Sequence, residues 1–234
     1  MENINFDNSW EEEYQKGNAL NKYPFDLVVS LVFQHFGKIK DKSKISVLDV
    51  GCGAGNNSLF FAQEGFDLLG IDGSPTVIEH VKSIFKEKNL KGTFKQMYFD
   101  NIKNINKEFD IVLDRESVYT LELVDVMDTF KSISQKLKKD GIFISFFYNK
   151  EHPDTRYLKE TKNNYTYYNP LNNAFGNSKR VTLFDLDLLN ECIKKSNLEI
   201  IQLYNHKIIP IIGADKYDNG ISEYIVVAKS TLNK

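Results

Sequence analysis

The chain has 234 residues, of which 41% are hydrophobic and 26% charged, and its formal net charge is -2. This balance indicates a soluble globular domain and excludes an intrinsically disordered chain or a strongly basic nucleic-acid binder. Because no apolar stretch approaches the ~20 residues that span a bilayer and the acidic N-terminus lacks a signal-peptide core, we expect a cytoplasmic protein without a membrane partner.

The first predicted element is a helix at residues 24–36, which ends at Gly37. Pro24 suits the first position of that helix, because proline needs no backbone donor there. An apolar strand at residues 45–50 follows, and a glycine-rich turn leads from it into a helix that ends at Glu64. The chain therefore begins with a helix and then a strand–turn–helix unit.

Strands and helices alternate through most of the remaining sequence. Ser74 and Pro75 open one helix as N-cap and first residue, and Thr182 with Asp185 forms a near-capping box for another. The further predicted strands are 66–72, 93–99, 109–114, 142–148, 198–204 and 223–229, and the helices cover about 74–88, 123–137 and 182–195. This alternation predicts an α/β fold with a doubly wound, mostly parallel sheet and helices on both faces.

Two segments lie outside this alternation, although we expect one domain over residues 1–234. Residues 1–40 are expected to form an N-terminal cap with helices. Residues 149–181 are too long for an ordinary connection and are unusually aromatic, with Tyr157, Tyr165, Tyr167, Tyr168 and Phe175. We therefore predict that residues 149–181 are a substrate lid inserted at the carboxyl edge of the sheet, with a disordered loop as the alternative.

The stretch VLDVGCGAGNNSLFF at residues 47–61 places Gly51, Gly53 and Gly55 between a strand and a helix. Such a turn presents backbone amides and a positive helix terminus to a ligand. Asp72 ends the next strand, where a carboxylate can accept both hydroxyls of a ribose. The glycine spacing differs from the G-x-G-x-x-G pattern that holds a pyrophosphate, so a dehydrogenase is the weakest interpretation.

The stretch VLDVGCGAG resembles the first motif of class I S-adenosylmethionine-dependent methyltransferases of the small-molecule type. Four later stretches resemble further motifs of the same family in order: GIDGS, QMYFDNI, FDIVLDRESVYTL and LKKDGIFIS. The last departs from the family pattern, because KKDG stands where a proline–glycine pair is usual. The resemblance implies a Rossmann-like, seven-stranded sheet with the last strand antiparallel, and S-adenosylmethionine as the cofactor with S-adenosylhomocysteine as its product.

The same resemblance implies roles for individual residues. Asp72 would take the ribose hydroxyls, Asp100 the adenine amine, and the backbone at Asn101 the adenine ring. Asp49 would lie beside the methionine portion, and Asp114 near the transferring methyl or the amino-acid end. The full implied cofactor set is Trp10, Tyr14, Asp49, Gly51, Cys52, Gly53, Gly55, Asp72, Gly73, Ser74, Asp100, Asn101 and Asp114.

The candidate catalytic residues are His152, Asp114 and Arg115. His152 follows the fifth strand and suits a general base, with a surface histidine as the alternative. Asp114 and Glu116 are further candidate bases. Arg115 could orient a substrate carboxylate or pair with Asp114 or Glu116. The sequence shows no set of metal ligands, and we expect no metal.

The interpretation favoured by these features is methyl transfer to an oxygen, nitrogen or sulfur atom of a small-molecule metabolite. Methylation of RNA or protein is an alternative, although the near-neutral charge argues against a nucleic-acid partner. A non-enzymatic alternative is a regulator or partner subunit that binds S-adenosylmethionine without turnover. The sequence leaves open whether the chain is a monomer or a homodimer.

Overall fold

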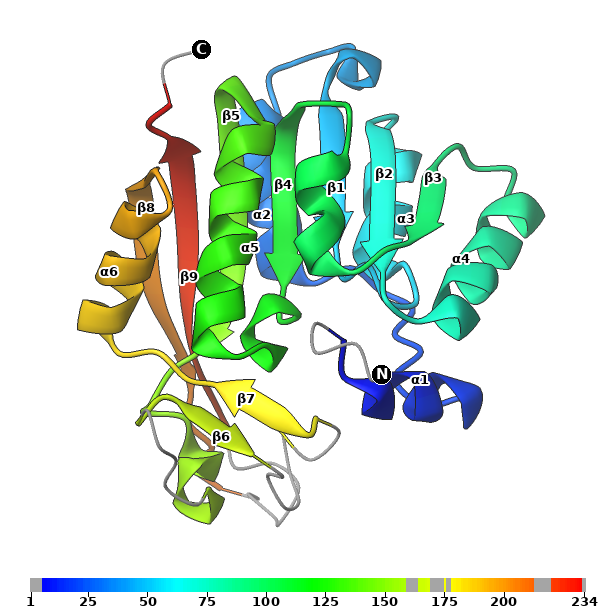
Figure 1. Ribbon diagram of the computed structural model, residues 1–234. Helices are drawn as coiled ribbons and strands as arrows, with labels where there is room; N and C mark the ends of the chain where they lie inside the picture. The colour runs from blue at the N-terminus through cyan, green and yellow to red at the C-terminus, as the bar shows by residue number, and fades with distance from the viewer. Residues whose placement is uncertain (1–5, 159–163, 169–174, 176–177, 213–219, 233–234) are drawn as a thin grey trace.

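The computed structural model describes residues 6–158, 164–168, 175, 178–212 and 220–232. Its main sheet has seven strands in the order β3-β2-β1-β4-β5-β9-β8 (Figure 1). These strands are β1 Ser46–Val50, β2 Asp67–Asp72, β3 Thr93–Gln96, β4 Phe109–Arg115, β5 Leu137–Tyr148, β8 Leu198–Ile208 and β9 Ile221–Ser230. Only β9 runs antiparallel to its neighbours within this described sheet, so the predicted methyltransferase-type topology is confirmed.

Helices cover both faces of the sheet, as predicted. The helices are α1 Asn8–Gln15, α2 Asp26–Phe36, α3 Asn56–Gln63, α4 Pro75–Glu87, α5 Leu123–Lys136 and α6 Leu186–Lys195. One apolar core lies between the sheet and α5 with α6, centred on Phe130, Phe143 and Phe147. The other core lies between the sheet and α2, α3 and α4 (Figure 1). These two cores hold the strands in a fixed register, which in turn fixes where the strand ends lie.

Short elements connect the layers around the carboxyl ends of the strands. Four 3₁₀ helices occur in the described chain: η1 Lys42–Lys44, η2 Phe99–Asn104, η3 Val118–Thr120 and η4 Pro153–Tyr157. A small antiparallel hairpin joins β6 Thr166–Tyr168 to β7 Arg180–Thr182. Figure 1 shows α1 and this hairpin both lying beyond the carboxyl ends of β1, β2 and β4. The two segments outside the strand–helix alternation therefore approach the same edge of the sheet.

Several predicted boundaries are wrong by a few residues. Phe25 is the N-cap of α2, so Pro24 precedes the helix instead of opening it. The helix α6 begins three residues later than predicted: Asp185 is its N-cap, and Thr182, the expected cap, belongs to β7. The stretch KKDG lies inside β5 and does not end α5, because β5 already pairs with β4 at Leu137. The predicted strand 93–99 stops at Gln96, where the chain turns toward η2.

The outer strand β8 continues further than predicted and is strongly exposed at its carboxyl end. It occupies one end of the sheet and pairs only with β9 in the described chain. The side chains of Ile208, Ile209, Ile211 and Ile212 are 53%, 73%, 94% and 93% exposed. No helix among the described residues is long and apolar enough to cross a membrane.

Candidate functional site

The turn between β1 and α3 depends on glycine at three positions. Gly51, Gly53 and Gly55 have φ of +67°, +50° and +82°, a region that L side chains rarely adopt. A Cβ at Gly51 would lie 2.3 Å from the Cβ of Ser117, and one at Gly55 would lie 2.3 Å from a methyl of Val81. The turn therefore packs closely against its surroundings while its backbone faces the carboxyl edge of the sheet.

Asp72 lies at the end of β2 beside this turn. Its carboxylate accepts hydrogen bonds from the backbone amides of Gly53 at 3.0 Å and Ser74 at 2.9 Å. Burial raises the pKa of Asp72 to about 6, although both amide donors favour the charged form. A carboxylate has about four lone-pair directions, so Asp72 can accept a further donor beside these backbone amides. Asp72 thus combines a structural role in the turn with free capacity toward a ligand.

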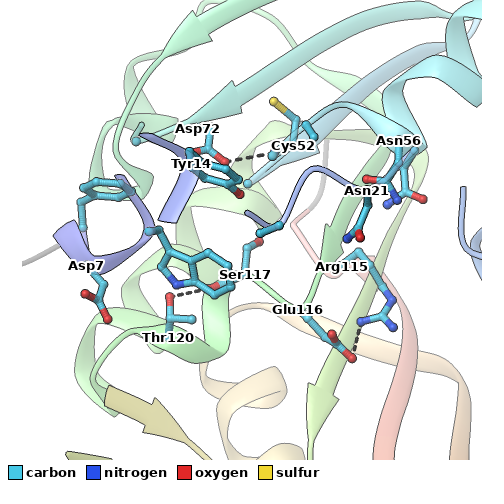
Figure 2. A pocket seen from close by; sticks show the side chains of 18 of the residues that line it. Asp7, Tyr14, Asn21, Cys52, Asn56, Asp72, Arg115, Glu116, Ser117 and Thr120 are labelled. Carbon is cyan, nitrogen blue, oxygen red and sulfur yellow. Dashed lines mark hydrogen bonds and ion pairs between the residues drawn. The ribbon is translucent and has the colours of Figure 1, made fainter. Parts of the chain in front are cut away.

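A cavity of about 350 Å³ opens beside Asp72 and the glycine turn. Its lining comes from the N-terminal segment (Phe6, Asp7, Trp10, Tyr14, Ala19, Asn21, Phe25), the turn and helix start (Gly51, Cys52, Gly53, Ala54, Asn56, Asn57), the strand ends (Asp72, Gly73, Phe99) and the chain after β4 (Arg115, Glu116, Ser117, Thr120). In Figure 2, Arg115 and Glu116 lie on the opposite side of the cavity from Asp72 and Tyr14. The two sides are chemically distinct.

The N-terminal helix α1 is fastened over the cavity by Glu11. The Glu11 carboxylate accepts hydrogen bonds from the Ser74 hydroxyl and, at 2.5 Å, from the Thr76 hydroxyl, both at the start of α4. Although burial opposes the charged form, these donors hold the pKa of Glu11 below its usual value. The Tyr14 hydroxyl lies 3.1 Å from the position that a Cβ at Gly53 would occupy. Tyr14 of the N-terminal segment therefore lies against the glycine turn.

Asp114 shapes the chain that follows β4. It is fully buried and accepts hydrogen bonds from the amides of Ser117 and Val118, each at 3.0 Å, and from the Ser145 hydroxyl at 2.6 Å. Burial raises its pKa, while these donors favour its charged form. Asp114 lies outside the cavity lining, so its contacts are those of a residue that positions Ser117 and its neighbours.

Arg115 and Glu116 form a buried charged pair at the far side of the cavity. Their side chains make an ion pair and are only 9% and 17% exposed. The Arg115 guanidinium also lies over the rings of Phe25 and Phe146, with its central carbon 4.0 and 4.9 Å from their centroids. Of the pairings considered for Arg115, the structure has the one with Glu116.

A second buried carboxylate, Glu223 of β9, completes this cluster. One Glu223 oxygen lies 2.8 Å from Nδ1 of His206, and the other lies 3.9 Å from Nη1 of Arg115. Burial raises the pKa of Glu223 to about 7, with Arg115 lowering it and Glu116 raising it. The cluster therefore contains two neighbouring carboxyls and one guanidinium.

His152 is buried behind this cluster and does not line the cavity. Its Nδ1 accepts a hydrogen bond from the Asp154 amide at 3.2 Å, so the neutral ring carries its proton on Nε2. The rings of Tyr148 and Phe175 pack against it, with centroids 4.8 and 4.9 Å away. Burial lowers the pKa of His152. In this tautomer Nε2 is a donor, which disagrees with a general-base role at that atom.

The structure brings together part of the predicted site. The predicted residues that line the cavity are Trp10, Tyr14, Gly51, Cys52, Gly53, Asp72, Gly73 and Arg115. Those that lie outside its lining are Asp49, Gly55, Ser74, Asp100, Asn101, Asp114 and His152. Ser74 caps α4 and bonds Glu11, and Asp49 accepts a hydrogen bond from Ser58 at 2.6 Å. Asp100 is exposed and accepts from the Asn101 side chain. Both lie outside the cavity lining, although Phe99 just before them is part of it.

Several residues that line the cavity are outside the sets of cofactor-binding and catalytic residues that the sequence predicts. Glu116 is predicted only as a candidate base. Ser117 lies just after β4, and Asn56 and Asn57 begin α3 after the glycine turn, which is the available signal for polar residues at this edge. Asp7 and Phe25 carry no such signal, because their position depends on how the N-terminal segment folds back. The described residues contain no group of three or more metal-ligand side chains that could hold an ion.

Comparison with known proteins identifies the family of the chain. Residues 20–203 match the family model described as a methyltransferase domain. Ubiquinone biosynthesis O-methyltransferases are similar: that of Rickettsia canadensis is 28% identical over 58% of this chain and 56% of the relative, and that of Pelagibacter ubique is 37% identical over 47% and 45%. The chain thus spans about half the length of the curated relatives it matches.

Solved structures share the fold at low sequence identity. An S-adenosylmethionine-dependent methyltransferase from Clostridium acetobutylicum is 15% identical, with a TM-score of 0.60 over 88% of this chain and 98% of that one. The 1,6-didemethyltoxoflavin-N1-methyltransferase of Burkholderia thailandensis is also 15% identical, with a TM-score of 0.67 over 94% and 85%; it was solved with 1,6-didemethyltoxoflavin and S-adenosylhomocysteine bound.

Proposed function

The chain belongs to the methyltransferase domain family, and we propose that it is a class I S-adenosylmethionine-dependent methyltransferase that methylates an oxygen, nitrogen or sulfur atom of a small molecule. The observation that carries the proposal is the cavity, whose two sides differ in chemistry. Asp72 and the glycine turn form one side, and the Arg115–Glu116 pair forms the other. Its volume of about 350 Å³ falls in the range of small-molecule sites.

The residues of the first side fit S-adenosylmethionine. Asp72 has lone pairs left for ribose hydroxyls, and Gly53 keeps the turn free of a side chain. The aromatic rings of Trp10, Tyr14 and Phe99 line the cavity and suit a cationic sulfonium, because ring faces attract cations. We retain Asp100 and Asn101 as proposed partners of the adenine, since they follow Phe99 directly in the chain.

The protein's contribution to methyl transfer is alignment and exclusion of water. The bound cofactor supplies a methyl group already activated by a positively charged sulfur. Asp114 fixes the chain after β4 and so positions Ser117 and Glu116 at the cavity. The N-terminal segment covers the cavity, and the described part of residues 149–181 is tied to it through Lys179 and Asp7. Shielding favours transfer to a neutral or anionic acceptor, because charge is dispersed in that step.

A small-molecule acceptor is supported by the covering segments and by the relatives. Segments that close over a cavity suit a compact acceptor better than a polymer chain, which needs an open groove. The relatives named above act, by their names, in ubiquinone biosynthesis, and one fold neighbour binds 1,6-didemethyltoxoflavin.

Two measurements test the proposal. Thermal shift with S-adenosylmethionine, S-adenosylhomocysteine and NAD should show stabilisation by the first two only. The protein is then incubated with labelled S-adenosylmethionine and a fractionated metabolite extract, and label should appear in a low-molecular-weight fraction. Tight binding with no fraction labelled would favour a non-enzymatic regulator. Label recovered in RNA or protein, abolished by ribonuclease or protease, would instead favour a macromolecular acceptor.

A further inference from the structure

The cluster of Arg115, Glu116 and Glu223 at the far side of the cavity contains buried polar atoms that lack hydrogen-bond partners among the described residues. Arg115, Glu116 and Glu223 come from β4, the residue after it and β9, and they meet where Tyr148 of β5 pairs in register with Glu223. Among the described residues, Nε of Arg115, Oε2 of Glu223 and Nε2 of His152 are buried without a hydrogen-bond partner. Buried polar atoms without partners are costly, and because Arg115 lines the cavity, its Nε without a partner points to a ligand there.

Glu116 is the member of the cluster that reaches the cavity with a carboxylate. It lines the cavity, and Figure 2 shows its side chain beside Arg115. Its backbone has φ of +54°, a left-handed conformation that is strained for a residue with a side chain. Strain of this kind persists where the surroundings enforce it and is concentrated at functional sites. The turn held by Asp114 enforces it here.

The charges around Glu116 determine what kind of group it can face. Arg115 already pairs with Glu116 and lies near Glu223, so one positive charge serves two carboxyls. An acceptor carboxylate or phosphate would be repelled by this arrangement. A neutral group that donates a hydrogen bond would be accepted, because a carboxylate oxygen only accepts. The acceptor atom at this position is therefore one that carries a proton.

We propose that Glu116 removes the proton from a neutral hydroxyl or amine of the acceptor and shares it with Glu223. This inference rests on the proposed function and specifies the class of acceptor. The acceptor's lone pair forms the new bond to the methyl carbon, while the carbon–sulfur bond breaks and its electron pair remains on sulfur. The acceptor's proton passes to a Glu116 oxygen, so the methylated product leaves neutral and the enzyme holds one extra proton.

Glu223 is suited to share that proton. Burial, with the Glu116 charge beside it, raises the pKa of Glu223 to about 7 even though Arg115 opposes the rise. The titratable groups facing the two carboxyls are Arg115 of β4, Tyr119 of η3, Tyr148 of β5, His152 after β5 and His206 of β8. The two tyrosines stay protonated, because burial raises the pKa of each well above neutrality. The two tyrosines therefore do not take up or release the transferred proton.

The shared proton can be tested without any acceptor. Carbon-13 labelling of glutamate side chains gives a pH titration of the Glu223 carboxyl by NMR, assigned with Glu223→Gln, in protein saturated with S-adenosylhomocysteine. Glu116→Gln should lower the midpoint of Glu223 by about one pH unit, because the neighbouring charge is removed. Glu151→Gln is the matched control, since it removes an exposed carboxylate from the same end of the sheet. An unchanged Glu223 midpoint in Glu116→Gln would overturn the proposal.

Turnover tests the proton transfer itself, using the labelled metabolite fraction as the acceptor. Glu116→Gln should lower kcat about 10²-fold or more while KM for S-adenosylmethionine and affinity for S-adenosylhomocysteine stay unchanged, and Glu116→Asp should restore part of kcat. Equal losses of kcat and cofactor affinity would indicate a structural role only and contradict the proposal. If no fraction accepts label from the wild type, the proposed function fails, and the NMR titration still decides whether the carboxyls share a proton.

Discussion

The backbone amide of Lys179 donates a hydrogen bond to the carboxylate of Asp7, which joins the predicted lid to the N-terminal segment at the cavity. The other Asp7 oxygen accepts from the Ser9 amide at 3.0 Å and caps α1. A single carboxylate therefore binds two segments that are 172 residues apart in the sequence. Arg180 joins the predicted lid to a different part of the cavity lining, since its Nε donates to the carbonyl oxygen of Thr120 in η3 at 2.9 Å.

Asp7→Asn should separate these two functions, because it replaces one of the two accepting oxygens with an amide nitrogen that only donates. We expect amide exchange at Lys179 to become about tenfold faster, which corresponds to the loss of one hydrogen bond to a charged group. Hydrogen exchange measured by mass spectrometry on the 178–182 peptide tests this. Asp41→Asn is the control, since Asp41 caps η1 far from the cavity. Unchanged exchange would mean that the contact does not hold the lid.

Removing the lid should separate cofactor binding from turnover. Deletion of part of 155–178 leaves the glycine turn and Asp72 intact, so we expect S-adenosylhomocysteine to bind and methyl transfer to be abolished. Calorimetry and labelled-methyl transfer measure the two effects. Full activity in the deleted protein would show that this stretch does not act as a lid.

Asp72→Ala should remove most of the cofactor affinity. The loss of a charged acceptor of ribose hydroxyls costs about 1.5–3 kcal/mol, or about 10- to 100-fold in Kd. Calorimetry with S-adenosylhomocysteine measures it, with thermal melting as the check on folding. Asp67→Ala is a matched control, because Asp67 is an exposed carboxylate at the other end of the same strand. Wild-type affinity in Asp72→Ala would refute the ribose-binding role.

Gly53→Ala should weaken cofactor binding beyond its effect on stability. Gly53 and Gly65 both have positive φ, so alanine strains either backbone by roughly 1–2 kcal/mol. The Cβ at position 53 would also enter the cavity near Tyr14, whereas that at 65 meets nothing within 4 Å. We expect both variants to melt at lower temperature and only Gly53→Ala to lose affinity. Equal affinities in the two variants would place the cofactor elsewhere.

The buried Asp49 makes the stability of the protein depend on pH. Burial raises its pKa to about 7, above the usual value of 3.8. Between these two pH values the folded state holds a proton that the unfolded state has lost. The contribution of Asp49 to the free energy of unfolding therefore falls by about 1.4 kcal/mol per pH unit between about 4 and 7. Urea titrations should show this slope removed in Asp49→Asn. The same slope in both proteins would mean that Asp49 stays charged.

The sheet could be predicted because local pattern and packing agree there. The apolar runs at β1, β2, β4 and β5 are buried on both faces, so their sequence is apolar whatever surrounds them. Boundaries were less accurate where tertiary pairing overrides local signals. The stretch KKDG looks like a helix end followed by a turn, yet its pairing with β4 draws it into β5. Thr182 resembles a cap residue, yet it pairs with Thr166 in the hairpin.

Some residues of the candidate site could likewise be predicted from the sequence, and others could not. Asp72 and the glycines could be placed from the sequence because they follow consecutive strands whose order fixes their neighbours. The pairing of Glu116 with Arg115 could be named only as one of several alternatives. The approach of Glu223 to that pair depends on β9 being inserted antiparallel between β5 and β8. No local pattern in the chain encodes that neighbour, so the sequence alone left Glu223 and His206 without a role.

The exposed end of β8 has a practical consequence for the concentrated samples that NMR requires. A free strand edge offers unpaired peptide groups, and the four exposed isoleucines at positions 208, 209, 211 and 212 add apolar surface beside it. Such edges recruit strands from other molecules, so we expect light scattering to increase with protein concentration. Ile211→Lys with Ile212→Lys should suppress that association without changing the cavity, because neither residue lines it. Colloidal behaviour and catalysis are thus governed by separate parts of this sheet.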